Sequence, residues 1–135
     1  MHPKYEQAHL LTKEVIAAAI EVHRHLGPGL IESIYEWALI HELGLRGISA
    51  VSQKPVTIRY KDAVREENLR FDILVEDCLL VEVKAAEAVT GIHKAIAMSY
   101  MKLLDVPLGL VTNFHEIRVV DGVHRLMLPG ASGQA

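Results

Sequence analysis

Two acidic residues and one lysine lie in segments that have the character of neighbouring β-strands. Glu82 and Lys84 are two residues apart, so their side chains leave the same face of a strand near Leu79–Lys84. Asp72 lies in the preceding strand-like segment, Leu69–Val75. Close carboxylates repel each other unless a cation lies between them, and oxygen ligands suit Mg²⁺ or Mn²⁺. These residues are candidates for a metal site; the alternative is a solvated strand face whose charges pair weakly.

The loop between the two strands decides whether the two acids meet. Asp72 and Glu82 are ten residues apart, so direct pairing requires an odd number of loop residues or a bulge. A two-residue turn at Glu76-Asp77 would send the acids to opposite faces. A three-residue loop that includes Cys78 pairs them and also makes the apolar face continuous, so we expect the odd loop. That face would consist of Phe71, Ile73, Val75, Val81 and Val83.

The apolar pattern predicts the helices that would position these strands. Spacings of three and four indicate a helix from about Thr12 to Leu26, and the sequence Gly27-Pro28-Gly29 predicts a sharp corner after it. A second helix begins after the corner, and Gly44 or Gly47 can end it. A third helix is expected from about Gly91 to Leu104.

Alternating patterns and β-branched residues predict the strands. A polar connection, Lys61–Glu67, separates the first two strands. The predicted strands are Pro55–Tyr60, Leu69–Val75, Leu79–Lys84, Leu108–Asn113 and Glu116–Val120. The resulting order, α-α-β-β-β-α-β-β, predicts an α/β fold with a mixed sheet flanked by helices.

The charge balance limits the class of protein. The chain has 14 Lys and Arg residues against 17 Asp and Glu residues, a formal net charge of -3. It therefore lacks the basic excess of a stand-alone, tight nucleic-acid binder, and a nucleic-acid contact would have to use a local patch. The candidates for that patch are Arg59, Lys61, Arg65 and Arg70.

Cysteine content and hydropathy indicate the cellular environment. The only cysteine, Cys78, allows no intrachain disulfide, and no apolar run approaches the roughly 18 residues of a membrane span. We expect a soluble, cytoplasmic protein that makes no membrane contact. We also expect one domain over residues 1–135, with its core at 11–128 and a flexible tail at 129–135.

The segment Gly29-Leu30-Ile31-Glu32-Ser33-Ile34-Tyr35 resembles the motif that names the GxxExxY proteins of bacteria and archaea. These proteins belong to the PD-(D/E)XK nuclease superfamily, and the similarity covers about Leu11 to Leu126. The other segments that carry it are Val22–Gly29, Gln53-Lys54-Pro55, Arg70-Phe71-Asp72, Glu82-Val83-Lys84 and Asn113-Phe114. The resemblance implies a restriction-endonuclease-like fold.

The resemblance also implies roles for the acids and the lysine. Asp72 and Glu82 become metal-binding acids, Glu32 becomes a third acid from the second helix, and Lys84 becomes the catalytic lysine. The implied activity is hydrolysis of phosphodiester bonds in DNA or RNA with Mg²⁺ or Mn²⁺. A homodimer would be compatible with it, since cutting two strands needs two sites. Candidates for supporting roles are Tyr35, Gln53, His93 and Tyr100. The alternative is a simple edge-strand position for Gln53 and a packing role for the other three.

Two positions depart from the pattern of the superfamily. Phe71 replaces the proline before Asp72, which changes no ligand. Related nucleases often carry Gln-x-x-x-Tyr on the helix after the lysine strand, and here Ile96 takes the place of the glutamine before Tyr100. The alternative function is therefore a catalytically weak or inactive nuclease-fold scaffold that binds nucleic acid or another protein.

Overall fold

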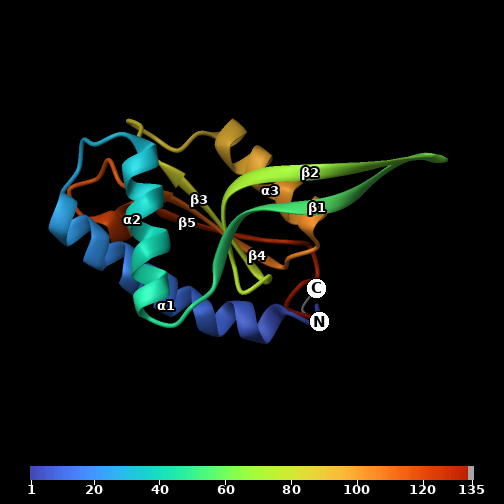
Figure 1. Ribbon diagram of the computed structural model, residues 1–135, viewed down its shortest axis with the longest axis horizontal. Helices are drawn as coiled ribbons and strands as arrows, with labels where there is room; N and C mark the ends of the chain where they lie inside the picture. Colours follow the sequence, from blue (N-terminus) through green and yellow to red (C-terminus); the bar gives the residue numbers. More distant parts are fainter. Residues whose placement is uncertain (134–135) are drawn as a thin grey trace.

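A computed structural model describes residues 1–133 of the chain, and Figure 1 shows its arrangement. The helices are α1 (Tyr5–Leu26), α2 (Glu32–Leu45) and α3 (Gly91–Leu104), with a 3-10 helix η1 at Val119–Gly122. The strands are β1 (Ala50–Tyr60), β2 (Ala63–Val75), β3 (Leu79–Lys84), β4 (Leu108–Asn113) and β5 (Val123–Met127). They form one sheet in the order β1-β2-β3-β4-β5, in which β3 and β4 are parallel and the other pairs are antiparallel. This confirms the predicted α/β fold class and element order.

Helices cover both faces of the sheet, and each face has its own hydrophobic core. Ile73 and Val81 belong to the core that packs against α1 and α2, whereas Leu74 and Leu80 belong to the core under α3. Neighbouring residues of a strand point to opposite faces, so β2 and β3 contribute to both cores. These two strands are therefore the buried centre of the fold, and they carry the predicted acids.

The first helix and the first two strands are longer than predicted. α1 begins at Tyr5 because its first turns are also packed, with Ala8 fully buried. β1 and β2 extend through most of the stretch predicted as a connection, and only Lys61 and Asp62 form the turn, with Lys61 at a φ of 55°. Polar residues are solvated on this hairpin, so its sequence looks like a loop.

The last strand was placed wrongly by the sequence pattern, at Glu116–Val120 instead of Val123–Met127. The chain first winds through η1 and passes very close to the end of β4. A Cβ atom added at Gly122 would lie 2.3 Å from the carbonyl oxygen of Asn113. The β-branched residues before Gly122 therefore form a tight turn, and pairing with β4 begins only after it.

The two ends of the described chain lie against each other. The His2 amide donates a hydrogen bond to the Ala131 carbonyl, with 2.9 Å between nitrogen and oxygen, and Ala131 is buried. The expectation of a flexible tail from residue 129 also covers residues 134 and 135, which lie outside the described residues. Among residues 1–133, no helix has the length and apolar character to cross a bilayer.

Candidate active site

The β2–β3 register brings the two acids to equivalent positions. Ile73 pairs with Val81 and Val75 pairs with Leu79, so the next positions outward are Asp72 and Glu82. The loop between the strands has three residues, 76–78. The expected odd loop is therefore confirmed, and Asp72 and Glu82 are close enough across the hairpin for Asp72 to act on the pKa of Glu82.

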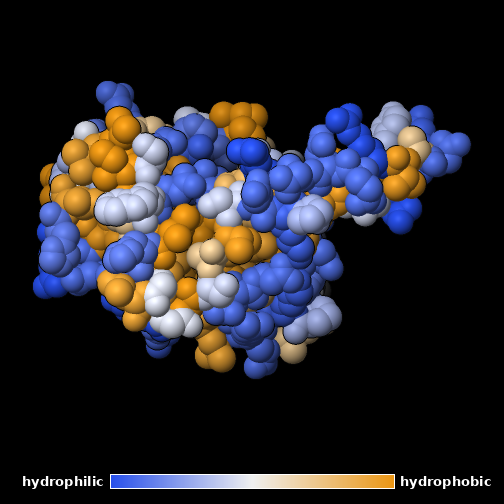
Figure 2. All heavy atoms as spheres, viewed as in Figure 1, coloured by the Kyte–Doolittle hydropathy of each residue, from blue (hydrophilic) through white to orange (hydrophobic). Residues whose placement is uncertain are grey.

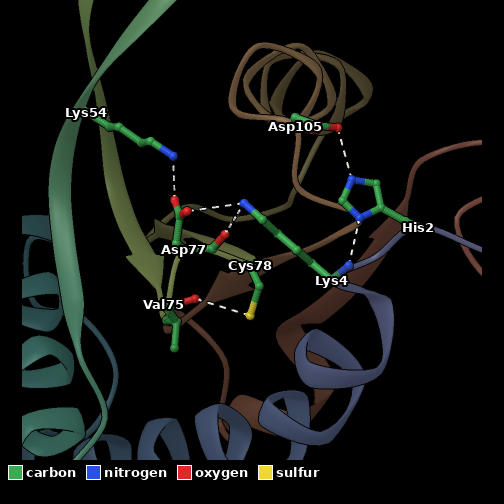
Figure 3. A network of polar contacts seen from close by, with 7 residues as sticks. All are labelled: His2, Lys4, Lys54, Val75, Asp77, Cys78 and Asp105. Atoms are coloured by element: carbon green, nitrogen blue, oxygen red, sulfur yellow. Dashed lines mark hydrogen bonds and ion pairs between the residues drawn. The ribbon is translucent and has the colours of Figure 1, made fainter.

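Two lysines hold this loop in place (Figure 3). The Asp77 carboxylate accepts hydrogen bonds from Lys54 Nζ at 2.6 Å and from Lys4 Nζ at 3.2 Å, and Lys4 also reaches the Asp77 carbonyl. Hydrogen bonds from Lys54 and then Lys4 lower the pKa of the Asp77 carboxyl. Within the loop, the Cys78 amide donates to the Val75 carbonyl at 3.0 Å. The turn that sets the register is thus tied to β1 and to the N-terminal segment.

A bulge in β2 changes the direction of the strand next to Asp72. Val51 pairs with Leu74 and Gln53 pairs with Arg70, so three residues of β2 lie opposite the single residue Ser52. The extra residues of a bulge bend a strand and redirect its side chains. The prediction that Phe71 shares the apolar face of Ile73 and Val75 is consequently wrong. Phe71 belongs to the core under α3, together with Leu74.

The side chain of Asp72 is fixed by the backbone of β3. Its Oδ2 atom accepts a hydrogen bond from the Val83 amide at 2.7 Å. The described β2–β3 pairing ends at Ile73 and Val81, so the carboxylate binds an amide where the backbone ladder has stopped. Because of this bond, the position of Asp72 depends on the strand and much less on solvent.

Glu82 is a buried acid with an unsatisfied oxygen. Its side chain lies on β3 and is only 7% exposed, and its Oε1 atom has no hydrogen-bond partner among the described residues. Burial, followed by the hydrogen bond and the negative charge of Asp72, raises the pKa of Glu82 to about 9, and the Lys84 charge partly opposes the shift. Without a cation, Glu82 is therefore protonated at neutral pH.

Glu32 approaches the end of β3 from α2. Its Oε1 atom accepts a hydrogen bond from the Ala85 amide at 3.2 Å, one residue beyond Lys84. Residues 1–133 contain no group of three or more His, Cys, Asp or Glu side chains close enough to hold an ion by themselves. Glu32 thus lies at the end of β3 and completes no three-acid cage with Asp72 and Glu82.

A fourth acid, Glu36, is part of the same neighbourhood and was missed by the sequence analysis. Burial, then the charge of Asp72 and then that of Glu32, raises the pKa of Glu36. Glu36 follows Glu32 by one helical turn, so the two side chains share one side of α2. That spacing of four was the available signal in the sequence.

The Tyr35 side chain fixes the corner from which Glu32 projects. The predicted corner contains two glycines with positive φ, Gly27 at 70° and Gly29 at 95°. The Tyr35 hydroxyl donates to the Gly27 carbonyl and accepts a hydrogen bond from the Leu30 amide at 3.1 Å. Its ring is fully buried and stacks on Phe114, with 4.6 Å between centroids. Tyr35 has a packing and positioning role, and its hydroxyl is used by the corner.

The segment after Lys84 is held by the end of β4. The Lys84 carbonyl accepts a hydrogen bond from the Phe114 amide at 2.8 Å. The buried Asn113 side chain donates to the Ala86 carbonyl at 2.8 Å and accepts from the Ala86 amide at 3.2 Å. These bonds fix the backbone on which Lys84 lies, with its half-buried side chain on the same strand as Glu82.

The other three candidates for supporting roles have contacts away from the acids. Gln53 lies on the edge strand β1 and accepts a hydrogen bond from the Asn68 side chain at 3.0 Å. His93 closes a capping box with Thr90 at the start of α3. Tyr100 packs, half-buried, against the core under α3. Among residues 1–133, no hydrogen bond joins any of these three side chains to the acids.

An open groove of about 730 Å³ lies beside the acids. Its wall includes Phe71, which precedes Asp72, and Glu36, whose pKa responds to the Asp72 charge. The full lining is Glu36, Val51, Ser52, Gln53, Arg70 and Phe71. Neither Asp72 nor Glu82 lines the groove, which adjoins the carboxylate pair only through Phe71 and Glu36.

Comparison with known proteins agrees with this geometry. No curated protein and no solved structure matches the chain. A family model described as the PD-(D/E)XK nuclease superfamily matches residues 9–126. The match covers most of the chain, including α2, the β2–β3 hairpin and Lys84, and the observed mixed sheet flanked by helices agrees with that fold. The chain belongs to the PD-(D/E)XK nuclease superfamily.

Proposed function

We propose that the protein is a divalent-metal-dependent nuclease that hydrolyses phosphodiester bonds in nucleic acid. The observation that carries the proposal is the buried Glu82 carboxylate, which has an unpartnered oxygen and lies beside Asp72. A buried carboxylate next to a half-buried one is unfavourable unless a proton or a cation neutralises one of them. A cation at this point would replace the proton that Glu82 holds in its absence and would give the unpartnered Oε1 atom a ligand bond.

The donor set fits Mg²⁺ or Mn²⁺. Mg²⁺ commonly binds one or two protein carboxylates and completes its octahedral shell with water and substrate phosphate oxygens. Asp72 and Glu82 would supply the carboxylates. Glu32, the first residue of α2, would interact with the water molecules that complete the coordination shell of the ion. When bound there, such an ion would supply positive charge to the scissile phosphate and would lower the pKa of a water molecule.

The remaining roles belong to side chains of the chain itself. Val83 holds Asp72 in one orientation through its amide, so the acid is preorganised. Lys84 lies beside Glu82, close enough to lower its pKa, and would orient the attacking water or offset charge that develops on the phosphate. Tyr35 would act as a positioning residue, through the corner that leads to Glu32.

Cleavage assays with matched variants test this proposal. Single- and double-stranded DNA and RNA are incubated with the protein and Mg²⁺ or Mn²⁺. We expect Glu82→Ala to abolish cleavage and Lys84→Ala to lower kcat by about 10²–10³-fold, whereas the exposed neighbour Glu87→Ala keeps full activity. Cleavage that persists in Glu82→Ala would come from a contaminant, and the proposal would lose its support.

One observation favours the alternative, a nuclease-fold scaffold without catalysis. Ile96, at the position where related nucleases often have glutamine, is 44% exposed on α3, so a substrate-facing polar group is missing there. Titration of Mn²⁺ in a calorimeter separates the two functions. A nuclease site gives binding heat that Asp72→Ala removes, and a scaffold gives no such heat.

A further inference from the structure

The β1–β2 hairpin continues well beyond the sheet as a two-stranded arm. β2 pairs with β3 only at residues 73–75, whereas its pairing with β1 extends from Gln53 and Arg70 to the turn at Tyr60 and Ala63. We name residues 53–70 the arm, and Figure 1 shows it projecting away from the body. At about 3.3 Å per residue, its eight-residue strands reach roughly 25 Å.

The arm is anchored at its base and uncovered at its tip. Val56 is buried in the core under α3, and Ile58 and Leu69 pack against that core. Farther out, Tyr60 is 70% exposed and Val64 is 54% exposed. Figure 2 shows that hydrophilic residues cover most of the arm. The outer part therefore adds no core to the fold, and its anchored base gives it a fixed direction.

The arm is basic although the chain is acidic. It contains five Lys and Arg residues against three Asp and Glu residues, while the whole chain has a net charge of -3. Two of the three acids are engaged within the arm, Glu66 by the Thr57 hydroxyl at 2.7 Å and Glu67 by Arg65 at 3.1 Å. No ion pair within residues 1–133 involves the arm cations Arg59, Lys61 and Arg70.

One face of the arm leads directly to the groove beside the acids. Gln53 and Arg70 are cross-strand partners, and Arg59 lies on the same face because it follows Gln53 by an even number of residues without a bulge. Gln53 and Arg70 also line the groove, next to Phe71. A negatively charged backbone bound along this face would be guided toward Asp72.

We propose that the arm enters the major groove of double-stranded DNA and presents the duplex to the proposed nuclease site. The major groove of B-form DNA admits a two-stranded β-ribbon, whereas the major groove of A-form RNA is too narrow for protein side chains. Unpaired cations on the arm provide contacts to phosphates. This inference rests on the proposed function, because the acids define where the bound duplex is led.

The test measures binding separately from cleavage, in a Glu82→Ala background. Duplex DNA, single-stranded DNA and duplex RNA of equal length are titrated at several salt concentrations. Adding Arg59→Ala and Lys61→Ala is expected to weaken duplex-DNA binding about tenfold. The negative slope of log K against log salt is expected to become shallower by about 0.9 per cation removed. Glu66→Gln is expected to strengthen it. The matched control removes two exposed cations elsewhere, Arg125→Ala with Lys102→Ala, and is expected to change binding much less.

The results distinguish this inference from the proposed function. If the arm variants lose affinity for duplex DNA alone, the proposed role of the arm is supported even where no cleavage is found, since cleavage tests only the nuclease proposal. The inference is overturned by an arm variant that binds duplex DNA as tightly as the control variant, or by equal losses for all three nucleic acids. It is also overturned by unchanged binding together with a shift from dimer to monomer in sedimentation, which would assign the arm to a second copy of the chain.

Discussion

The Asp72 carboxylate accepts a hydrogen bond from the Val83 amide, with 2.7 Å between oxygen and nitrogen, next to the position of Glu82 on β3. The strand that carries one acid therefore orients the other. The donor is a backbone amide of β3, so no side-chain substitution other than proline can remove it. The orientation of Asp72 is therefore set by the backbone of the sheet. The two acids consequently differ in their electrostatic surroundings. Asp72 Oδ2 accepts a hydrogen bond from a backbone amide, whereas Glu82 Oε1 has no hydrogen-bond donor within residues 1–133.

The burial of Glu82 predicts an unusual dependence of stability on pH. In the metal-free protein its pKa is about 9, against an ordinary value of 4.5, because burial and then Asp72 disfavour the charged form. The folded state thus binds this proton more tightly than the unfolded state. The stability that Glu82 contributes is fully present below about pH 4.5 and is lost as the pH rises through about 9.

Replacement by glutamine keeps the shape of the side chain and removes the titration. We expect Glu82→Gln to be close to the wild type at pH 5 and to exceed its free energy of unfolding at pH 9 by roughly 5 kcal/mol, since each tenfold change in proton affinity is worth about 1.4 kcal/mol. Urea titrations in EDTA measure this difference, with the exposed Glu87→Gln as control. Parallel pH profiles for the wild type and Glu82→Gln would show that Glu82 is ionised in the folded protein.

Metal binding is predicted to release a proton. An ion that binds Glu82 must displace the proton that the acid holds at pH 7, so we expect about one proton per ion. Calorimetry with Mn²⁺ in buffers of different ionisation enthalpy measures this number. At 100 times its Kd, the ion should also raise the free energy of unfolding by about 2.7 kcal/mol. Binding heat that is independent of the buffer would contradict the exchange of proton for cation, and Glu82→Gln provides the control without a titrating group.

The buried hydroxyl of Tyr35 predicts a loss of stability without a change in chemistry. Tyr35→Phe leaves the Leu30 amide and the Gly27 carbonyl without their partner, which should cost about 1–3 kcal/mol. We expect the pH profile of cleavage to stay unchanged, because no described contact joins this hydroxyl to the acids. Tyr60→Phe, on the exposed arm, should leave stability unchanged. A large fall in kcat at wild-type stability would instead place Tyr35 in the chemistry.

The parts of the site that could be predicted depend on local rules. The even separation of Asp72 and Glu82 allowed the three-residue loop to be inferred, because parity along a strand decides which face a side chain takes. The odd loop also places Val81 and Val83 on a continuous apolar face across both strands, which favoured it over the register of a two-residue turn. Helix positions were similarly accessible from the spacing of apolar residues, apart from the extra turns at the start of α1.

The parts that were missed depend on contacts between distant segments. The bulge opposite Ser52 is set by the pairing of β1 with β2, and it moved Phe71 to the other core. The charges of Asp72 and Glu32 act on Glu36 only in the folded chain. Only the outer part of the arm, Lys61–Glu67, was predicted as a connection, because nearly all of its side chains are solvated and it shows no hydrophobic period.

The close approach of η1 to β4 predicts that Gly122→Ala damages the site from a distance. An added Cβ would lie 2.3 Å from the Asn113 carbonyl oxygen and 3.1 Å from Asn113 Cβ. Relief of this contact would move Asn113, whose side chain holds Ala86 in the segment after Lys84. Overpacking of this kind typically costs about 1–3 kcal/mol.

We therefore expect Gly122→Ala to be less stable than the wild type and to lose cleavage even at temperatures where it remains folded. Gly44→Ala is the matched control: this glycine lies in α2, and an added Cβ would meet nothing within 4 Å beyond its chain neighbours and the backbone of its own helix, so the change should stabilise the helix by about 1 kcal/mol. Thermal unfolding and cleavage rates are measured for both variants at a temperature where circular dichroism shows each to be folded. Full activity of folded Gly122→Ala would show that the position of Lys84 does not depend on the packing of η1 against Asn113.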